Sequence, residues 1–263
     1  MSRPLPRKLM VINKQKISCN MLRITLGGDA LQDFPLDQES GYIKLHFAKE
    51  DVLEGDIEQQ LRSDDAQTRP TLRTYTVRQQ RQDPCEIDVD FVVHEGGPAS
   101  DWAINSQQGE QIYVAGPGKK KLVDVTADWF FLAADMTALP AISVNLALLP
   151  DNARGYAVIE VLEQADIQPL AFPENFELHW VINNHQQGTS LLLDAVKALP
   201  PLPGKPSVWL ACEFTSMRAL RQYFHADLQI NRRSVYASSY WKLGLTEEEH
   251  KRVKSVDNLA EQA

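Results

Sequence analysis

Cysteine is scarce in this chain, and its pattern narrows the class of protein. The 263 residues include only Cys19, Cys85 and Cys212, with no Cys-x-x-Cys pair, which argues against a disulfide framework and against a cysteine-bound iron–sulfur or zinc site. The 6 histidines have no metal-ligand spacing either, so we expect no tightly bound metal. Such cysteine usage is typical of a reducing compartment, and it predicts a cytoplasmic protein.

Long apolar runs and an excess of positive charge are also missing. No run approaches the ~20 apolar residues that a membrane span requires, and the start of the chain leads only into a short apolar stretch at residues 9–12, so we expect neither a membrane segment nor an export signal. The net charge of −8 argues against a protein that binds nucleic acid or anionic membranes as a whole. Any anion site must therefore be local. A chain of this length can form one large or two ordinary domains, and a monomer is the default.

A short segment, Arg73-Thr74-Tyr75-Thr76-Val77-Arg78, combines a cation, an aromatic ring and hydroxyl groups. In an extended strand Arg73 and Tyr75 share one face, while Thr76 lies on the other. Arg73 can pair with a pyrophosphate, Tyr75 can stack on an isoalloxazine ring, and Thr76 can hydrogen-bond a ring nitrogen. The segment is therefore suited to holding a flavin dinucleotide.

A second segment, His94-Glu95-Gly96-Gly97-Pro98-Ala99-Ser100, follows after one more strand. The two glycines can adopt backbone angles closed to other residues, and Pro98 suits the first turn of a helix whose first amides attract phosphate. Either segment alone also fits an ordinary exposed strand or turn. Their order and separation along the chain favour a shared anionic ligand.

Four ordered motifs lie between about residues 5 and 250: Arg73-Thr74-Tyr75-Thr76-Val77-Arg78, Asp90-Phe91-Val92-Val93-His94 with Gly96-Gly97-Pro98-Ala99-Ser100-Asp101-Trp102-Ala103, Ala133-Ala134-Asp135-Met136-Thr137-Ala138-Leu139-Pro140-Ala141-Ile142, and Tyr240-Trp241-Lys242-Leu243-Gly244. They resemble the motifs of the siderophore-interacting protein family of ferredoxin-reductase-like flavoproteins. The resemblance implies an FAD enzyme that reduces ferric siderophores with electrons from a nicotinamide cofactor. It also implies that FAD is bound by Arg73, Thr74, Tyr75, Thr76, Asp90, Phe91, Val92, His94, Gly96, Gly97, Pro98, Ala99 and Ser100, with Thr137, Ala138 and Trp241 nearby.

The pattern of hydrophobic residues changes near the middle of the sequence. Up to about residue 122, short segments of alternating hydrophobicity predict an antiparallel β-barrel, interrupted by a polar excursion at residues 51–70 with one short helix. From about residue 127, apolar runs alternate with helical patterns at 140–149, 190–199 and 216–228, which predicts a parallel α/β sheet. Thr215 or Ser216 is the expected cap of the last of these helices. We therefore expect an FAD-binding barrel at 1–122, an NAD(P)H-binding domain at 127–240, and a C-terminal extension at 241–263 that packs near the flavin.

The expected nucleotide site lies at the carboxyl ends of the parallel strands, where open α/β sheets bind ligands. No Gly-x-Gly-x-x-Gly fingerprint is present, and an ordinary capped helix near Asp135 is an equally good reading. Candidate nicotinamide contacts at the strand ends are Thr137, Ala138, Glu213 and Thr215. Arg218 and Arg221, which share one helical face at positions i and i+3, are candidates for binding the 2′-phosphate of NADPH, and solvated surface charges are the alternative.

A ferric siderophore is commonly anionic, so an acidic protein needs a local basic rim to attract it. The candidate substrate contacts are Lys44, which the family resemblance favours, and Lys119, Lys251 and Arg252, with Lys120, Lys121, Lys242 and Lys254 in the same runs. Such charge runs more often form solvated faces. Trp241 is placed close to the flavin by the resemblance, although late tryptophans are often core anchors.

Three functions remain open. The leading one is an FAD-dependent ferric-siderophore reductase that uses NADH or NADPH. A protein of the same fold that takes electrons from ferredoxin is the second, and a non-catalytic siderophore-binding protein is the third. The sequence does not separate the electron donors or identify the siderophore.

Overall fold

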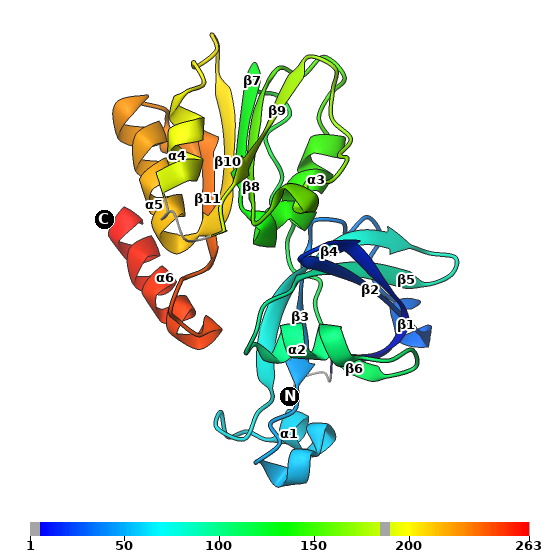
Figure 1. Cartoon of the computed structure of the whole chain (residues 1–263). Helices are drawn as coiled ribbons and strands as arrows, with labels where there is room; N and C mark the ends of the chain where they lie inside the picture. The colour runs from blue at the N-terminus through cyan, green and yellow to red at the C-terminus, as the bar shows by residue number, and fades with distance from the viewer. Residues whose placement is uncertain (1–5, 185–189, 263) are drawn as a thin grey trace. The chain divides into compact units, whose positions relative to one another are not determined.

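A computed structural model describes residues 6–184 and 190–262. The chain separates into two compact units, Met1–Lys120 and Lys121–Ala263 (Figure 1). Among the described residues no helix is both long and apolar enough to cross a membrane.

The first unit is a closed six-stranded barrel with the strand order β1-β2-β5-β4-β3-β6, in which every neighbouring pair is antiparallel. It confirms the predicted antiparallel barrel. The strands are β1 (Arg7–Ser18), β2 (Met21–Gly27), β3 (Tyr42–Phe47), β4 (Thr71–Arg81), β5 (Glu86–Val92) and β6 (Gln111–Ala115).

Alternation along β3 shows why the barrel closes around an apolar interior. Ile43, Leu45 and Phe47 are buried, whereas the residues between them are more exposed, and in a strand alternate side chains point to opposite faces. Val77, Val89 and Phe91 join the same core from β4 and β5. The first strand is longer than its apolar pattern indicates: residues 9–12 are followed by polar, mostly exposed residues that still pair with β2.

Short helices complete this unit: η1 (Asp29–Leu31), η2 (Leu53–Gly55), α1 (Ile57–Arg62) and α2 (Pro98–Asn105). The polar excursion contains one short α-helix, as predicted, together with a 3-10 turn. Asp56 caps α1 by accepting from the amides of Glu58 and Gln59. The buried amide of Gln60 donates to the carbonyls of Lys49 and Val52 at 2.8 Å each, and this fixes the base of the excursion.

The second unit contains a five-stranded parallel sheet with the order β11-β10-β7-β8-β9. Numbered within the unit this order is 5-4-1-2-3, the doubly wound arrangement that reverses direction between its first and fourth strands. It confirms the predicted parallel sheet. The strands are β7 (Trp129–Ala134), β8 (Gly155–Val161), β9 (Phe176–Ile182), β10 (Pro206–Glu213) and β11 (Val235–Trp241).

Helices cover both faces of this sheet. Leu192 and Val196 of α4 and Met217 and Leu220 of α5 join one core with the sheet, and α3 lies against the other face (Figure 1). The helical segments are η3 (Met136–Ala138), α3 (Leu139–Ala147), η4 (Gln164–Asp166), α4 (Ser190–Lys197), α5 (Phe214–Gln222), the π-helical turn η5 (Tyr223–Asp227), η6 (Arg232–Ser234) and α6 (Glu247–Gln262).

The cap of α5 differs from the prediction. Glu213, rather than Thr215 or Ser216, is the N-cap residue, and its carboxylate accepts from the amides of Thr215 and Ser216. A strand that ends on an acid can cap the next helix directly because the carboxylate already lies beside the first free amides.

The last helix, α6, packs against the edge strand β11. Lys254 Nζ donates to Ser238 Oγ at 2.7 Å and to the Ser239 carbonyl at 2.6 Å, and Ser239 Oγ lies 2.8 Å from His250 Nε2. Burial lowers the pKa of Lys254 from its usual value. Lys254 therefore faces β11 and is not part of an exposed basic rim, contrary to the expectation for the tail cations.

Candidate functional site

The two faces of β4 separate the residues of its motif. Tyr75 is paired with Ile43, and Arg73 is paired with Leu45. Opposite residues of an antiparallel pair share a face, and Ile43 and Leu45 belong to the barrel core. Arg73 and Tyr75 therefore share one face of β4, as the alternation predicts, and the structure shows that this is the inward face.

Thr74 and Thr76 lie on the other face of β4, and Lys44 joins them there. Lys44 is directly opposite Thr74 and also pairs with Ala115 of β6. Thr74 is exposed, whereas Thr76 is buried. The candidate siderophore contact Lys44 and the candidate flavin contacts Thr74 and Thr76 thus share one face of the β3–β4 ladder.

Tyr75 is held by an aromatic chain that runs through the barrel core. Its ring centroid lies 4.3 Å from that of Phe91 at an interplanar angle of 37°. Phe91 in turn lies 5.8 Å from Trp102 of α2, and Trp102 lies 6.0 Å from Phe47. Such aromatic pairs fix ring orientation as well as burying area. The β4 segment and the α2 segment are therefore linked through Phe91.

The turn before α2 has the backbone that its glycines predict. Gly96 has a φ of 77°, in the left-handed region that favours glycine. A Cβ at Gly97 would lie only 2.4 Å from Cε1 of His94. The amide of His94 donates to Ser100 Oγ at 2.9 Å, which closes the turn.

Helix α2 starts with Pro98 after Gly97, which supplies no side-chain cap. Ala99 and Ser100 are buried behind this turn, whereas His94 is exposed. The first amides of α2 can therefore face an anion.

Asp90 contributes to the barrel itself. Its carboxylate accepts two hydrogen bonds from Arg23, at 2.6 and 2.8 Å, and lies 3.9 Å from Arg78. Its neighbour Phe91 points into the core, and Val92 ends β5 opposite Met21. The Asp90 carboxylate is thus already paired with Arg23 and Arg78. Any contact between residues 90–92 and a flavin would therefore come through the backbone of this segment.

In the second unit, the buried carboxylate of Asp135 joins the carboxyl ends of three strands. It follows β7, and its Oδ1 accepts from the amide and hydroxyl of Thr137 at 2.9 and 2.5 Å. Oδ2 accepts from the amide of Glu213 on β10 and from Nε1 of Trp241 on β11, both at 2.7 Å. Burial nevertheless raises the pKa of Asp135, because desolvation outweighs these hydrogen bonds.

Asp135 therefore brings several predicted nucleotide contacts together. Thr137 and the wholly buried Ala138 form the turn that it caps, and Glu213 and the half-buried Trp241 are tied to it directly. The exposed Thr215 follows Glu213 at the start of α5. The strand order reverses between β7 and β10, which is where doubly wound sheets bind ligands.

Sequence reasoning missed Glu160, a second acid near this edge. It lies on β8, is 8% exposed, and accepts from Asn183 Nδ2 at 3.1 Å. Burial, reinforced by the charges of Asp135 and Glu213, raises the pKa of Glu160 to about 7. An acid inside an otherwise apolar run was the available signal.

Arg218 and Arg221 both pair with Asp257 of α6. Arg221 makes a two-pronged contact at 2.9 and 3.1 Å and is largely buried, so its guanidinium serves the packing of α6. Arg218 Nε lies 3.0 Å from the same carboxylate, but 60% of its side chain is exposed. Of the two, only Arg218 presents a substantial exposed surface to a ligand.

The remaining candidate substrate cations lie on separate elements. Lys119 is exposed in the segment after β6. Lys251 and Arg252 are exposed on α6, where Lys251 pairs with Glu247 at 2.7 Å. Lys119 and Lys44 belong to the first unit, and Lys251 and Arg252 belong to the second.

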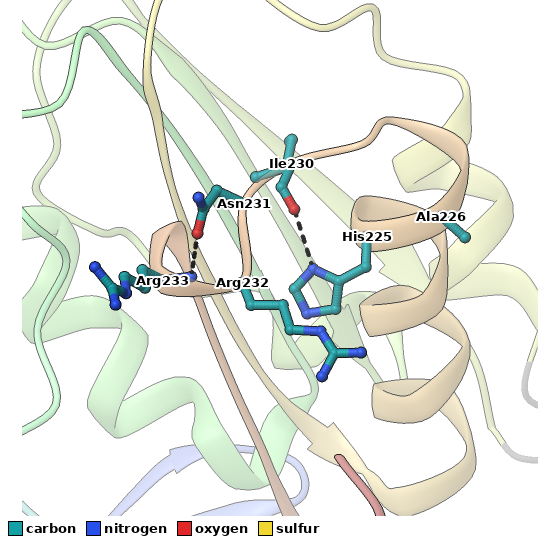
Figure 2. A pocket seen from close by; sticks show the side chains of 6 residues that line it. All are labelled: His225, Ala226, Ile230, Asn231, Arg232 and Arg233. Atoms are coloured by element: carbon teal, nitrogen blue, oxygen red, sulfur yellow. Dashed lines mark hydrogen bonds between the residues drawn. The ribbon is translucent and has the colours of Figure 1, made fainter. Parts of the chain in front are cut away.

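A hollow of about 580 Å³ lies in the second unit, at the end of the sheet opposite to Asp135. Figure 2 shows His225, Arg232 and Arg233 around it, with Nδ1 of His225 3.2 Å from the carbonyl of Ile230. Because η6 leads into β11, this hollow is at the amino end of that strand. Ligands of such sheets bind at the carboxyl ends, so the expected nucleotide site lies at the other end of the sheet from this hollow.

The barrel residues fit FAD. The α2 amides and the open Gly96 backbone suit a pyrophosphate, Arg73 supplies a cation, and Tyr75 supplies an aromatic ring held by Phe91. Comparison with known proteins agrees: residues 10–121 match the model of the siderophore-interacting FAD-binding domain, and residues 127–244 match that of the siderophore-interacting protein. The chain belongs to the siderophore-interacting protein family. The expected family, fold and FAD cofactor are thereby confirmed.

Three known proteins are similar to this chain over most of its length. The ferric vibriobactin reductase ViuB of Vibrio cholerae is 36% identical over 258 residues, which are 95% of this chain and 94% of that protein. The crystal structure of the siderophore-interacting protein SipS from Aeromonas hydrophila has a TM-score of 0.84 and 30% identity, and covers 95% of this chain and 97% of its own. The NADPH-dependent ferric-chelate reductase of Escherichia coli is 28% identical over 241 residues, 89% of this chain and 92% of that protein.

Proposed function

We propose that this protein is an FAD-dependent ferric-siderophore reductase that takes electrons from NAD(P)H and releases ferrous iron in the cytoplasm. The observation that carries the proposal is that one chain combines an FAD-binding barrel domain with a parallel sheet whose strand ends are tied together by Asp135. Doubly wound sheets bind nucleotides at this carboxyl end. The names of its relatives, ferric vibriobactin reductase and NADPH-dependent ferric-chelate reductase, support the same reaction. The cytoplasmic location rests on the cysteine pattern.

The chemistry of the bound flavin is to accept a hydride and to deliver electrons singly to Fe(III). In the barrel, Tyr75 and the α2 turn orient the cofactor. In the second unit, Thr137 and Thr215 are the proposed nucleotide contacts, and Asp135 and Glu213 fix the backbone that presents them. No side chain is required to act as a general acid or base, because the protein contributes orientation and electrostatics.

Lys44 is the proposed cationic contact for the ferric chelate. It is partly exposed and lies opposite Thr74 on the face that also bears Thr76. An anionic chelate near these threonines would be attracted by the Lys44 ammonium even though the chain as a whole is acidic. Lys119, Lys251 and Arg252 are the further proposed substrate contacts. We also propose that the protein is a monomer.

The test uses the full chain with its flavin under anaerobic conditions. NADH or NADPH is added first, and a ferric tris-catecholate or a ferric hydroxamate follows in the presence of a ferrous-specific chelator. We expect the flavin absorbance to bleach with the nucleotide and to recover with the ferric chelate. Because a hydride carries two electrons, two ferrous ions should be trapped for each NAD(P)H consumed.

Each alternative gives a different result in this experiment. A flavin that stays oxidised with both nucleotides but is reduced by ferredoxin would favour the ferredoxin-dependent reading. A folded protein that retains no flavin yet binds the ferric chelate would favour a siderophore-binding role, and it would contradict the proposed reaction.

A further inference from the structure

The strand order of the second unit indicates where the two halves of a dinucleotide would lie. In doubly wound sheets a dinucleotide crosses the point where the strand order reverses, and an acid that follows the second strand can hydrogen-bond the adenosine ribose 2′-hydroxyl. Here the first strand is β7 and the second is β8, which ends at Val161. The acid that follows it in the chain is Glu163.

Glu163 is fixed at the carboxyl end of β8 by a reciprocal cap. Its amide donates to Asp166 Oδ2 at 3.2 Å, and its own carboxylate accepts from the amide of Asp166 as the N-cap of η4. Asp166 is fully buried, whereas Glu163 is exposed. The cap thus holds an exposed carboxylate just after the second strand, where doubly wound sheets can place the acid that binds the ribose.

The charge of the surrounding chain reinforces this placement. Between Arg154 and Lys197 the sequence contains no lysine or arginine. Arg154 is at the amino end of β8 and donates to the carbonyls of Asp128 and Pro203, while Lys197 ends α4 beside the ring of Tyr223. Neither cation therefore belongs to the carboxyl end of β8, and a 2′-phosphate would meet the Glu163 carboxylate there.

The competing cation for a 2′-phosphate is Arg218. It lies on α5, which follows β10 on the other side of the strand-order reversal from β8. Its guanidinium is directed to Asp257 of α6. Its position thus places it away from the second strand, where the ribose is read.

We infer that Glu163 determines the choice of electron donor, accepting a hydrogen bond from the 2′-hydroxyl of NADH and repelling the 2′-phosphate of NADPH. This inference rests on the proposed use of a nicotinamide dinucleotide and deepens it. It sets the chain apart from the Escherichia coli relative, whose name specifies NADPH.

The test measures binding of two fragments, AMP and 2′-phospho-AMP, to the flavin-containing full chain by calorimetry. The wild type should bind AMP roughly 10- to 100-fold more tightly, because placing like charges together is costly. Glu163→Gln keeps an acceptor for the cap but removes the charge, and it should bring the two dissociation constants to within roughly threefold. The rate of flavin reduction by NADH, divided by the rate with NADPH, should fall in parallel.

Glu174→Gln is the matched control. It removes one exposed carboxylate from the same cation-free stretch, but before β9 and hence at the amino end of the sheet. Its AMP to 2′-phospho-AMP ratio should equal that of the wild type. A Glu174→Gln effect as large as that of Glu163→Gln would overturn the inference, since it would indicate a general charge effect.

Further outcomes separate this inference from the proposed function. If the flavin is reduced by both nucleotides and Glu163→Gln leaves the fragment ratio unchanged, the inference fails and the proposed function stands. A selective loss of 2′-phospho-AMP binding in Arg218→Ala would likewise overturn it in favour of the α5 cation. If neither fragment binds and neither nucleotide reduces the flavin, the proposed donor fails, and the inference fails with it.

Discussion

Nε1 of Trp241 donates a 2.7 Å hydrogen bond to Oδ2 of Asp135, so the last residue of β11 is tied to the residue that follows β7. The same oxygen accepts the amide of Glu213. Strands β7, β10 and β11 are neighbours in the sheet. One buried carboxylate therefore sets the relative positions of their carboxyl ends.

Asp135→Asn should destabilise the second unit. The single amide oxygen of asparagine can replace only one of the two carboxylate oxygens. The NH₂ group would then face N–H or O–H groups that now donate to Asp135, and each buried donor left without an acceptor costs about 1–3 kcal/mol. Urea unfolding should show a loss of about 2 kcal/mol or more. In a double-mutant cycle with Trp241→Phe the two changes should be coupled. Strict additivity would show that Asp135 does not position Trp241.

Tyr75→Ala should weaken FAD retention. The change removes both the ring proposed to stack on the flavin and its contact with Phe91, so we expect roughly tenfold or greater loss of affinity. Equilibrium dialysis with flavin absorbance measures the effect. Tyr75→Phe, which keeps the ring, should retain FAD. Unchanged flavin content in Tyr75→Ala would contradict the stacking role.

Lys44→Ala should raise the KM for an anionic ferric siderophore more than the KM for the nucleotide. A partly exposed ion pair contributes up to ~1 kcal/mol, so a two- to fivefold effect is expected, and it should shrink with added salt. Lys16→Ala, on an exposed position of β1, is the control and should leave both constants unchanged. Equal effects of Lys44→Ala on both substrates would argue against a chelate-binding cation.

Stability should fall as the pH rises through the titration of Glu160. Burial raises the pKa of this group from 4.5 to about 7, so between these values the folded state binds more protons than the unfolded state, and the free energy of unfolding decreases with pH. The shift of 7 − 4.5 = 2.5 corresponds to a total of about 3 kcal/mol.

Glu160→Gln removes this titration. The variant keeps an acceptor for Asn183, so it should gain stability over the wild type above pH 7 and lose much of the slope below it. Urea unfolding at a series of pH values from 4.5 to 8 measures both effects. The same pH dependence of stability in Glu160→Gln and in the wild type would show that Glu160 ionises as an ordinary acid.

Arg221→Ala should detach or destabilise α6. Arg221 and Asp257 form a mostly buried ion pair. Because the exposed Arg218 still pairs with Asp257 in the variant, we expect a loss of about 1–3 kcal/mol, the cost of removing one partner from a buried hydrogen-bonded contact. Arg252→Ala removes an exposed cation from α6 itself and should change stability by less than ~0.5 kcal/mol. Denaturant unfolding compares the two variants. Equal free energies of unfolding for Arg221→Ala and Arg252→Ala would refute the role of Arg221 in anchoring α6.

The sequence predicted the architecture because local patterns report burial. The alternation in β3 and the apolar run in β7 depend on nearest neighbours within one strand. The full length of β1 was not predictable in the same way, because its polar second half is held by pairing with β2 and buries little.

The contacts that organise the site are long-range, and no local pattern specifies them. Asp135 and Trp241 are 106 residues apart, and Arg221 and Asp257 are 36 apart. The cap of α5 was missed for a different reason: serine and threonine are common caps, but Glu213 ends the preceding strand close enough to reach the same amides.

The cation-free stretch that surrounds Glu163 also determines how the protein responds to trypsin, which cleaves after lysine and arginine. Residues 155–197, with β8, β9 and α4, contain no cleavage site before Lys197. The exposed segment after β8 cannot be nicked by this protease however accessible it is. A glutamate-specific protease would cut there, and protection by AMP against cleavage after Glu163 would report occupancy of the ribose position on an ordinary gel.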